Sequence, residues 1–270
     1  DGKHEVETVL QALELADRIE LEPAPALSVE GFPEDTLVRD ALAALRAAAG
    51  SEHWWRVRIE KRIPVAAGRG GGSSDAATAL RLANATLAEP VGDERLHALA
   101  ARVGADVPYF LVGGSQLATG DGTVLEPVSL PTDYAVLLVL PHGVRKSSTA
   151  SVYAALDARD GARGFESRRA ALRAALERVS SPRDLATLPP NDLCSSPLAA
   201  SLVALGAFRA DVTGAGSISG RNRSREYPQG TTCTCAASRP YSATRSRLVL
   251  AESATTARHR LRIRGTMCRK

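Results

Sequence analysis

A glycine-rich segment over residues 64–77, with the sequence PVAAGRGGGSSDAA, has the composition of a phosphate-binding loop. Its glycines are Gly68, Gly70, Gly71 and Gly72. Without a Cβ atom, glycine can adopt positive φ angles and turn its N–H group toward an anion. Ser73 and Ser74 add hydroxyl donors, and a helix expected to begin near Ser74 adds unpaired N–H groups and the positive end of its dipole. Such a segment would suit a nucleoside triphosphate.

The flanks of this segment decide between a binding loop and a flexible linker, which glycine and serine runs often form. Residues 54–61 alternate apolar and charged side chains, as a half-buried strand does. Residues 76–83 place apolar side chains at helical spacing. A strand, a glycine segment and a helix in this order favour phosphate binding. The segment lacks the lysine of the Gly-x-x-x-x-Gly-Lys-Ser/Thr loop and has a different glycine spacing from the Rossmann fingerprint.

Asp106 is the candidate for the chemical step. It follows a helix expected to begin at Asp93 as N-cap and to end near Val103, with Gly104 as its terminator. A carboxylate at such a change of direction can accept the proton of an attacking hydroxyl, provided that a nearby cation keeps it ionised. A capping or turn aspartate is the alternative interpretation.

Residues 64–77 and 104–111 together resemble the ATP-binding loop and the catalytic-aspartate segment of the GHMP kinases. Three shorter segments are also similar to that family, and the resemblance spans roughly residues 1–216. These segments are Asp1-Gly2-Lys3-His4-Glu5, Lys61-Arg62-Ile63-Pro64 and Asn191-Asp192-Leu193. Within the family, the resemblance is to the members that phosphorylate 4-diphosphocytidyl-2-C-methyl-D-erythritol in non-mevalonate isoprenoid synthesis.

The resemblance implies an α+β fold. A ribosomal-protein-S5-like ATP-binding domain would cover residues 1–132, without its first strand, and an incomplete ferredoxin-like domain would cover residues 133–216. It also implies that ATP, with Mg²⁺, donates its γ-phosphoryl group to the 2-hydroxyl of the substrate. In this comparison Asp106 is the catalytic residue, and His4 and Asp106 bind the substrate. The implied ATP-binding residues are Lys61, Pro64, Val65, Ala66, Ala67, Gly68, Arg69, Gly70, Gly71, Gly72, Ser73 and Ser74.

Two other functions remain open at this point. One is another kinase of the same family, acting on homoserine or a mevalonate-type alcohol. The other is a catalytically impaired fragment, because the family has a lysine-bearing strand that would precede Asp1. The single methionine is Met267, which predicts a missing leading segment. Lys3 and Arg69 stand where the family prefers tyrosine and leucine.

The last part of the chain, residues 217–270, differs in character from the rest. It holds 12 Lys and Arg against 2 Asp and Glu, whereas residues 1–216 hold 22 and 28. The change interrupts a second glycine motif that starts at residues 210–216. A shifted reading frame or a disordered tail is therefore our prediction. A basic arm that binds nucleic acid or an acidic surface is the alternative.

Composition limits the class of protein. A hydrophobic content of 44% is enough for a packed core, and no apolar run reaches the length of a membrane span. The net charge of +4 combines an acidic body with a basic tail, so it does not predict nucleic-acid binding. Only Cys194 lies in the body, so no disulfide framework is expected. The sequence predicts a cytoplasmic enzyme acting on a small molecule, as a monomer or homodimer, with no membrane partner.

The elements that must position these residues follow from periodicity and turn signals. A helix is expected over residues 34–49, closed by Gly50, and a hairpin is expected around Gly120-Asp121-Gly122. A domain boundary is expected near Thr132. Other predicted strands cover residues 6–15, 18–21, 115–119, 123–128 and 134–140, and other predicted helices cover residues 148–158, 165–179 and 196–205.

Overall fold

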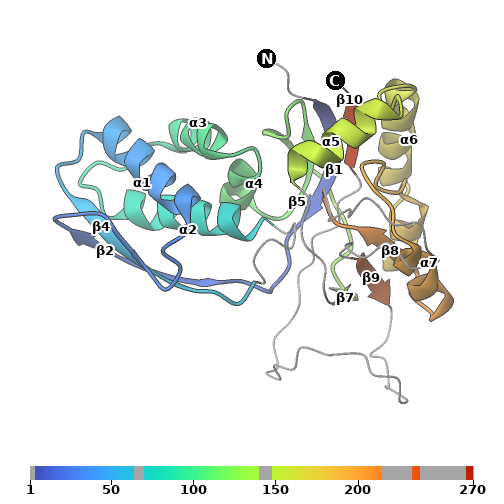
Figure 1. Cartoon of the computed structure of the whole chain (residues 1–270), viewed down its shortest axis with the longest axis horizontal. Helices are drawn as coiled ribbons and strands as arrows, with labels where there is room; N and C mark the ends of the chain where they lie inside the picture. The colour runs from blue at the N-terminus through green and yellow to red at the C-terminus, as the bar shows by residue number, and fades with distance from the viewer. Residues whose placement is uncertain (1–3, 64–69, 140–147, 215–232, 238–265, 270) are drawn as a thin grey trace. The chain divides into compact units, whose positions relative to one another are not determined.

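The computed structural model of the chain describes residues 4–63, 70–139, 148–214, 233–237 and 266–269 (Figure 1). The chain divides into two compact units. The first unit comprises Asp1–Leu10, Leu15–Val128 and Thr266–Lys270, and the second comprises Gln11–Glu14 and Ser129–Gly265. The assignment of named kinase domains to residues 1–132, 133–216 and 217–270 stays a prediction.

A three-stranded sheet and four helices form much of the first unit. In chain order they are β2 (Arg18–Ala24), β3 (Ser28–Glu30), α1 (Thr36–Ala49), β4 (Trp54–Glu60), α2 (Gly71–Ala85), α3 (Asp93–Val103) and α4 (Val107–Val112). The strand order is β2-β4-β3, with β2 antiparallel and β3 parallel to β4. Helices α1 and α2 pack on each other and lie on one face of this sheet (Figure 1).

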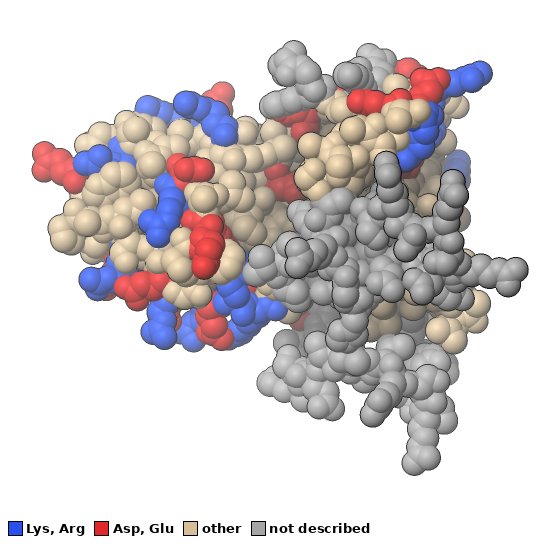
Figure 2. Space-filling view, in the orientation of Figure 1, with Lys and Arg blue, Asp and Glu red and all other residues tan. Residues whose placement is uncertain are grey.

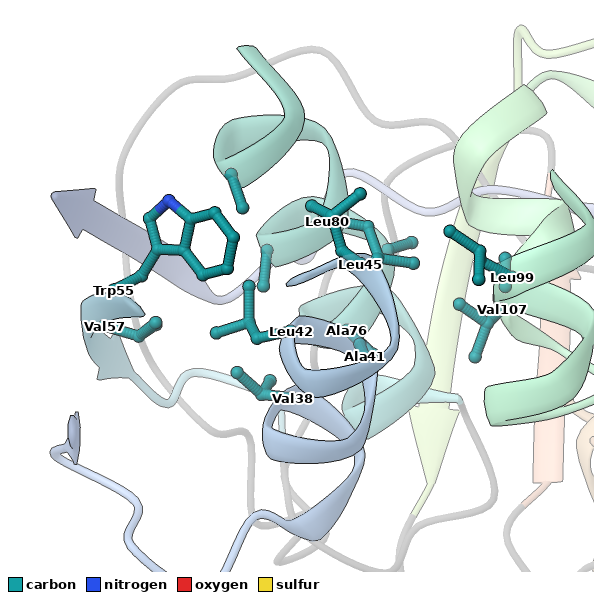
Figure 3. Packing of buried hydrophobic residues seen from close by; sticks show 14 of the residues in the cluster. Val38, Ala41, Leu42, Leu45, Trp55, Val57, Ala76, Leu80, Leu99 and Val107 are labelled. Carbon is teal, nitrogen blue, oxygen red and sulfur yellow. The ribbon is translucent and has the colours of Figure 1, made fainter. Parts of the chain in front are cut away.

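The core of this unit lies between the sheet and the two helices. Trp55, Val57 and Ile59 of β4 are buried and alternate with exposed charged residues, as the sequence predicted. Figure 3 shows Trp55 and Val57 meeting apolar side chains of α1 and α2. The fully buried residues on the two helices include Val38, Ala41, Leu42, Leu45, Ala76, Ala77 and Leu80.

The outer face of the same sheet carries charges of both signs. Arg56 lies 2.9 Å from Glu22, and Arg18 lies 2.9 Å from Glu20, with all four side chains more than half exposed. Figure 2 shows Lys and Arg intermixed with Asp and Glu on the viewed face of this unit. Exposed pairs of this kind contribute little to stability.

A second sheet completes the first unit. Its strands are β1 (Glu5–Gln11), β5 (Ser115–Thr119), β6 (Val124–Pro127) and β10 (Thr266–Arg269), in the order β10-β1-β5-β6. Strands β5 and β6 form the predicted antiparallel hairpin. Strand β10 pairs antiparallel with β1, with Arg269 opposite Glu5.

The second unit is a three-stranded antiparallel sheet with helices. Its strands are β7 (Ala135–Val139), β8 (Arg209–Val212) and β9 (Cys233–Ala237), in the order β7-β9-β8. Its helices are α5 (Thr149–Ala158), α6 (Phe165–Leu176), the 3₁₀ helix η1 (Pro182–Thr187) and α7 (Pro197–Ala204). Strands β9 and β10 both come from the basic tail, where the sequence predicted no strand.

Several element boundaries lie a few residues from their predicted positions, and capping explains the starts of two helices. Asp35 accepts a hydrogen bond from the Val38 N–H group, so α1 begins at Thr36 instead of at residue 34. The N-cap of α3 is Gly92, and Asp93 is the first helical residue. Residues 12–15 were expected to extend the first strand, but β1 ends at Gln11.

Candidate functional site

The amino-terminal end of α2 exposes backbone donors that the helix itself does not use. Gly70 is the N-cap and has a φ angle of 66°. The helical ladder starts where the Ser74 N–H group donates to the Gly70 carbonyl oxygen at 2.8 Å. The N–H groups of Gly71, Gly72 and Ser73 therefore have no acceptor inside the helix. The first turn contains no acidic side chain, so the positive end of the helix dipole can attract an anion.

The sequence predicted that this helix begins near Ser74, but α2 begins at Gly71. Positive φ is used at Gly70, whereas Gly71 and Gly72 are helical and serve close packing. A Cβ atom on Gly71 would lie 3.3 Å from Cγ2 of Ile63, and one on Gly72 would lie 3.3 Å from Cδ1 of Leu37. A side chain at either position would require the neighbouring side chain to shift by a few tenths of an ångström.

A buried ion cluster joins the end of β4 to α2. The Lys61 ammonium nitrogen lies 2.5 Å from Oδ2 of Asp17 and 2.8 Å from Oδ2 of Asp75. The Asp17 and Asp75 side chains are 1% and 2% exposed, and Lys61 is 16% exposed. Strand pairing explains the meeting, because β2 and β4 are antiparallel with Arg18 opposite Glu60. Asp17, just before β2, therefore comes beside Lys61, just after β4.

The three groups shift one another's pKa values. Burial raises the pKa of Asp75 to about 7, although the hydrogen bond and charge of Lys61 act to lower it. Burial also acts to raise the pKa of Asp17, but hydrogen bonds from Lys61, Ile63 and Arg62 outweigh it and hold the pKa below its usual range. Burial acts to lower the pKa of Lys61, but the two carboxylates raise it. Lys61 therefore stays protonated at neutral pH.

Asp106 lies at the amino-terminal end of α4, which packs against α2. It is the N-cap residue and is half-buried. The next residue, Val107, is fully buried in the same cluster as Ala76 and Ala77 of α2. The helix that carries Asp106 and the helix that carries the donor groups thus share one core.

The β5–β6 hairpin links the beginning of β1 to the Asp106 segment. The Val6 N–H group donates to the Gly120 carbonyl oxygen at 2.7 Å. Gly122 has a φ angle of 98°, and a Cβ atom there would lie 3.7 Å from Cγ2 of Val6 and 4.0 Å from Cβ of Ala105. His4 directly precedes β1, and both Val6 of this strand and Ala105, the neighbour of Asp106, lie beside Gly122.

The other predicted site residues divide into two groups. Gly70, Gly71, Gly72, Ser73 and Ser74 form the start of α2, and the Lys61 ammonium is held by Asp17 and Asp75. Pro64, Val65, Ala66, Ala67, Gly68 and Arg69 lie outside the described residues.

The sequence prediction missed Asp17 as part of this region. A single aspartate between two predicted strands is typical of a turn, and its partner Lys61 is 44 positions away. Asp75 was noted only as part of the family motif. The signal for its burial was its place on the apolar face of the predicted helix, next to Ala76.

Asn191, the family marker in the second unit, has a structural role. Its side-chain amide donates to the carbonyl oxygens of Val212, at 3.0 Å, and Gly214, at 2.8 Å. Its own oxygen accepts from the Leu193 N–H group at 3.0 Å. Asn191 therefore joins the loop before α7 to the end of β8.

The described residues were also compared with the patterns of a metal site and of a membrane span. In the part of the chain that the structure describes, no group of three or more His, Cys, Asp or Glu side chains could hold a metal ion. Among the described helices, none is long and apolar enough to cross a membrane.

Comparison with known proteins identifies the family to which the chain is similar. Residues 36–114 match the GHMP kinases N terminal domain. A 4-diphosphocytidyl-2-C-methyl-D-erythritol kinase of Pelotomaculum thermopropionicum is 44% identical over 164 residues, which are 57% of this chain and 56% of that protein. The protein of the same name from Nocardia farcinica is 38% identical over 232 residues, covering 82% of this chain and 74% of that protein. The match thus spans about half the length of some of these relatives and nearly three quarters of another.

Solved structures agree with this result. A crystal structure of 4-(cytidine 5'-diphospho)-2C-methyl-D-erythritol kinase is 29% identical, with a TM-score of 0.61, and the match covers 86% of this chain and 91% of that one. The Methanococcus jannaschii mevalonate kinase shares the fold, with a TM-score of 0.63 at 11% identity over 87% of this chain and 89% of that one. The predicted α+β fold is thus confirmed, and this chain belongs to the GHMP kinase family.

Proposed function

We propose that the protein is an ATP-dependent kinase that phosphorylates the 2-hydroxyl group of 4-diphosphocytidyl-2-C-methyl-D-erythritol. The observation that carries this proposal is the packing of α2, with unused N–H groups at its start, against α4, with Asp106 at its start. Relatives with this activity in their names support the choice of substrate. The reaction would take place in the cytoplasm, in a monomer or homodimer.

In this proposal the start of α2 binds the ATP phosphates. The N–H groups of Gly71, Gly72 and Ser73 and the hydroxyl groups of Ser73 and Ser74 supply donors for the anionic oxygens. Residues 64–69 would complete the loop. Because Lys61 already contacts two carboxylates, its contribution to ATP binding would be indirect.

Asp106 would orient the substrate hydroxyl and accept its proton, and His4 would contact the cytosine base. Phosphoryl transfer depends mainly on positioning and on stabilising charge, so a correctly placed carboxylate is enough for this role. Mg²⁺ would supply neutralisation of phosphate charge. It usually binds through one or two carboxylates, substrate phosphates and waters.

A phosphorylation assay tests this proposal. ATP consumption should depend on 4-diphosphocytidyl-2-C-methyl-D-erythritol and not on homoserine or mevalonate. Asp106→Asn should lower turnover by about 100-fold or more, because it removes the proton acceptor. The affinity for ATP should not change. Asp93→Asn, at an exposed position of α3, is the matched control. Unchanged turnover in Asp106→Asn would remove this residue from the mechanism, and a preference for mevalonate or homoserine would change the substrate.

A further inference from the structure

We propose that Asp17 is a positioning residue that holds the start of α2 in the geometry required for binding the phosphates of ATP. This inference rests on the proposed function. Asp17 lies in the connection between β1 and β2, far in sequence from the glycine segment. Its carboxylate is nonetheless the point where the end of β4 and the beginning of α2 are joined.

One oxygen of Asp17 fixes the backbone that leaves β4. Oδ1 accepts hydrogen bonds from the N–H groups of Arg62, at 2.5 Å, and Ile63, at 2.8 Å. Two consecutive N–H groups are thus directed at a single buried oxygen. Ile63 is 7% exposed and faces Gly71, so fixing its backbone also fixes the surface on which the helix start rests.

The other oxygen acts through Lys61. Oδ2 of Asp17 accepts from the Lys61 ammonium, which also donates to Asp75 in the second turn of α2. The Phe32 ring centroid lies 5.5 Å from the same ammonium. A Cβ atom on Gly71 would lie 3.6 Å from the Lys61 ammonium nitrogen, so Lys61 lies beside the helix start.

The role of Asp17 therefore differs from that of a surface ion pair. Exposed pairs are mobile and contribute little, whereas a buried carboxylate with three donors has one arrangement that satisfies it. Positions of N–H groups around an anion must be held within fractions of an ångström for full effect. Loss of the Asp17 contacts should therefore weaken nucleotide binding even where the fold survives.

The test compares three variants by nucleotide affinity and by hydrogen exchange. Asp17→Asn keeps the size of the side chain but removes its charge. It should weaken binding of a non-hydrolysable ATP analogue by about tenfold. It should also speed amide exchange at residues 62–63 and 71–74. Asp17→Glu keeps the charge for Lys61 but displaces the oxygens, so it should fold and give an intermediate affinity. Glu22→Gln is the matched control, because Glu22 lies on β2 and pairs with Arg56 at an exposed position. It should leave analogue affinity and amide exchange unchanged.

A purely structural role would lower the melting temperature of Asp17→Asn without changing analogue affinity in the folded protein. Analogue affinity within about twofold of the wild type in both Asp17 variants would overturn the proposal, whatever the exchange rates. If Asp17→Asn does not fold, Asp17→Glu decides alone. If the wild-type chain itself does not bind the analogue, the proposed function fails, and exchange in the free protein still shows whether Asp17 fixes the helix start.

Discussion

The Lys61 ammonium lies 2.8 Å from the Asp75 carboxylate, and this contact joins the end of β4 to the second turn of α2. Lys61 also contacts Asp17, so one buried cation is shared by two carboxylates. Burial is the main cause that raises the pKa of Asp75 to about 7, whereas hydrogen bonds from Lys61, Ile63 and Arg62 hold the pKa of Asp17 below its usual range. The cluster makes the first unit sensitive to pH at a place next to the helix start.

Asp75→Asn should flatten the pH dependence of stability between about pH 4 and pH 7. The pKa of Asp75 is about 7 in the folded protein and 3.8 in a solvated chain. Between these values the folded protein keeps a proton that the unfolded chain has lost. The free energy of unfolding therefore falls as the pH rises, by on the order of a few kcal/mol in total.

Urea unfolding of the wild type and Asp75→Asn at several pH values from 4.5 to 7.5 measures this difference. The opposite contribution of Asp17 appears only below about pH 4, because its folded pKa is lowered and its stabilisation is lost as the pH falls through that value. Equal slopes for the two proteins in the measured range would show that Asp75 does not titrate there.

Gly71→Ala should destabilise the protein by about 1 kcal/mol. Alanine is a better helix former than glycine, but its Cβ atom would lie 3.3 Å from Cγ2 of buried Ile63. Thermal unfolding measures the balance of these two effects. Gly92→Ser is the control, because a Cβ atom at that N-cap meets nothing within 4 Å and serine is a good N-cap residue. A more stable Gly71→Ala protein would mean that Ile63 moves aside at little cost.

Leu80→Ala should cost about 2–5 kcal/mol in free energy of unfolding, because Leu80 is fully buried between α2 and α1. Figure 3 shows it beside Leu45. Leu82→Ala changes the same residue type on the same helix at a position that is 37% exposed, and should cost about 0.5 kcal/mol or less. Denaturant titration of both variants compares them. Similar losses would contradict the packing of α2 described here.

Asp35→Ala should destabilise α1 by about 1 kcal/mol, because the Val38 N–H group loses its acceptor at 2.9 Å. Asp35→Asn keeps an acceptor oxygen, so its loss in stability should be no more than a few tenths of the loss in Asp35→Ala. Circular dichroism during thermal unfolding measures both. An equal loss in the two variants would assign the effect of Asp35 to its charge and not to capping.

Local patterns were enough to predict much of the first unit. The alternation of Trp55, Val57 and Ile59 predicted β4, and the glycine and serine run predicted a helix start with free donors. Periodicity and capping depend on residues at most four positions apart, so they can be read directly. The predicted helix start near Ser74 was wrong, because only the structure shows Gly70 as the N-cap with positive φ.

The tail shows where local patterns are not enough. A shifted reading frame or a disordered tail stays a prediction, but the sequence predicted no strand in residues 217–270, whereas β9 and β10 each pair with strands from distant parts of the chain. Strand pairing is made by backbone groups and depends on the partner that is available, so composition alone is a poor guide to it.

The order of β4, a glycine-rich segment and α2 was determined by the sequence itself, as was the position of Asp106 shortly after the end of α3. The tertiary structure alone decided which carboxylates meet Lys61. Antiparallel pairing of β2 with β4 brings Asp17 beside Lys61 across 44 positions, and the packing of α2 brings in Asp75. Such contacts depend on strand register and helix packing, which the whole chain determines by burying its apolar faces.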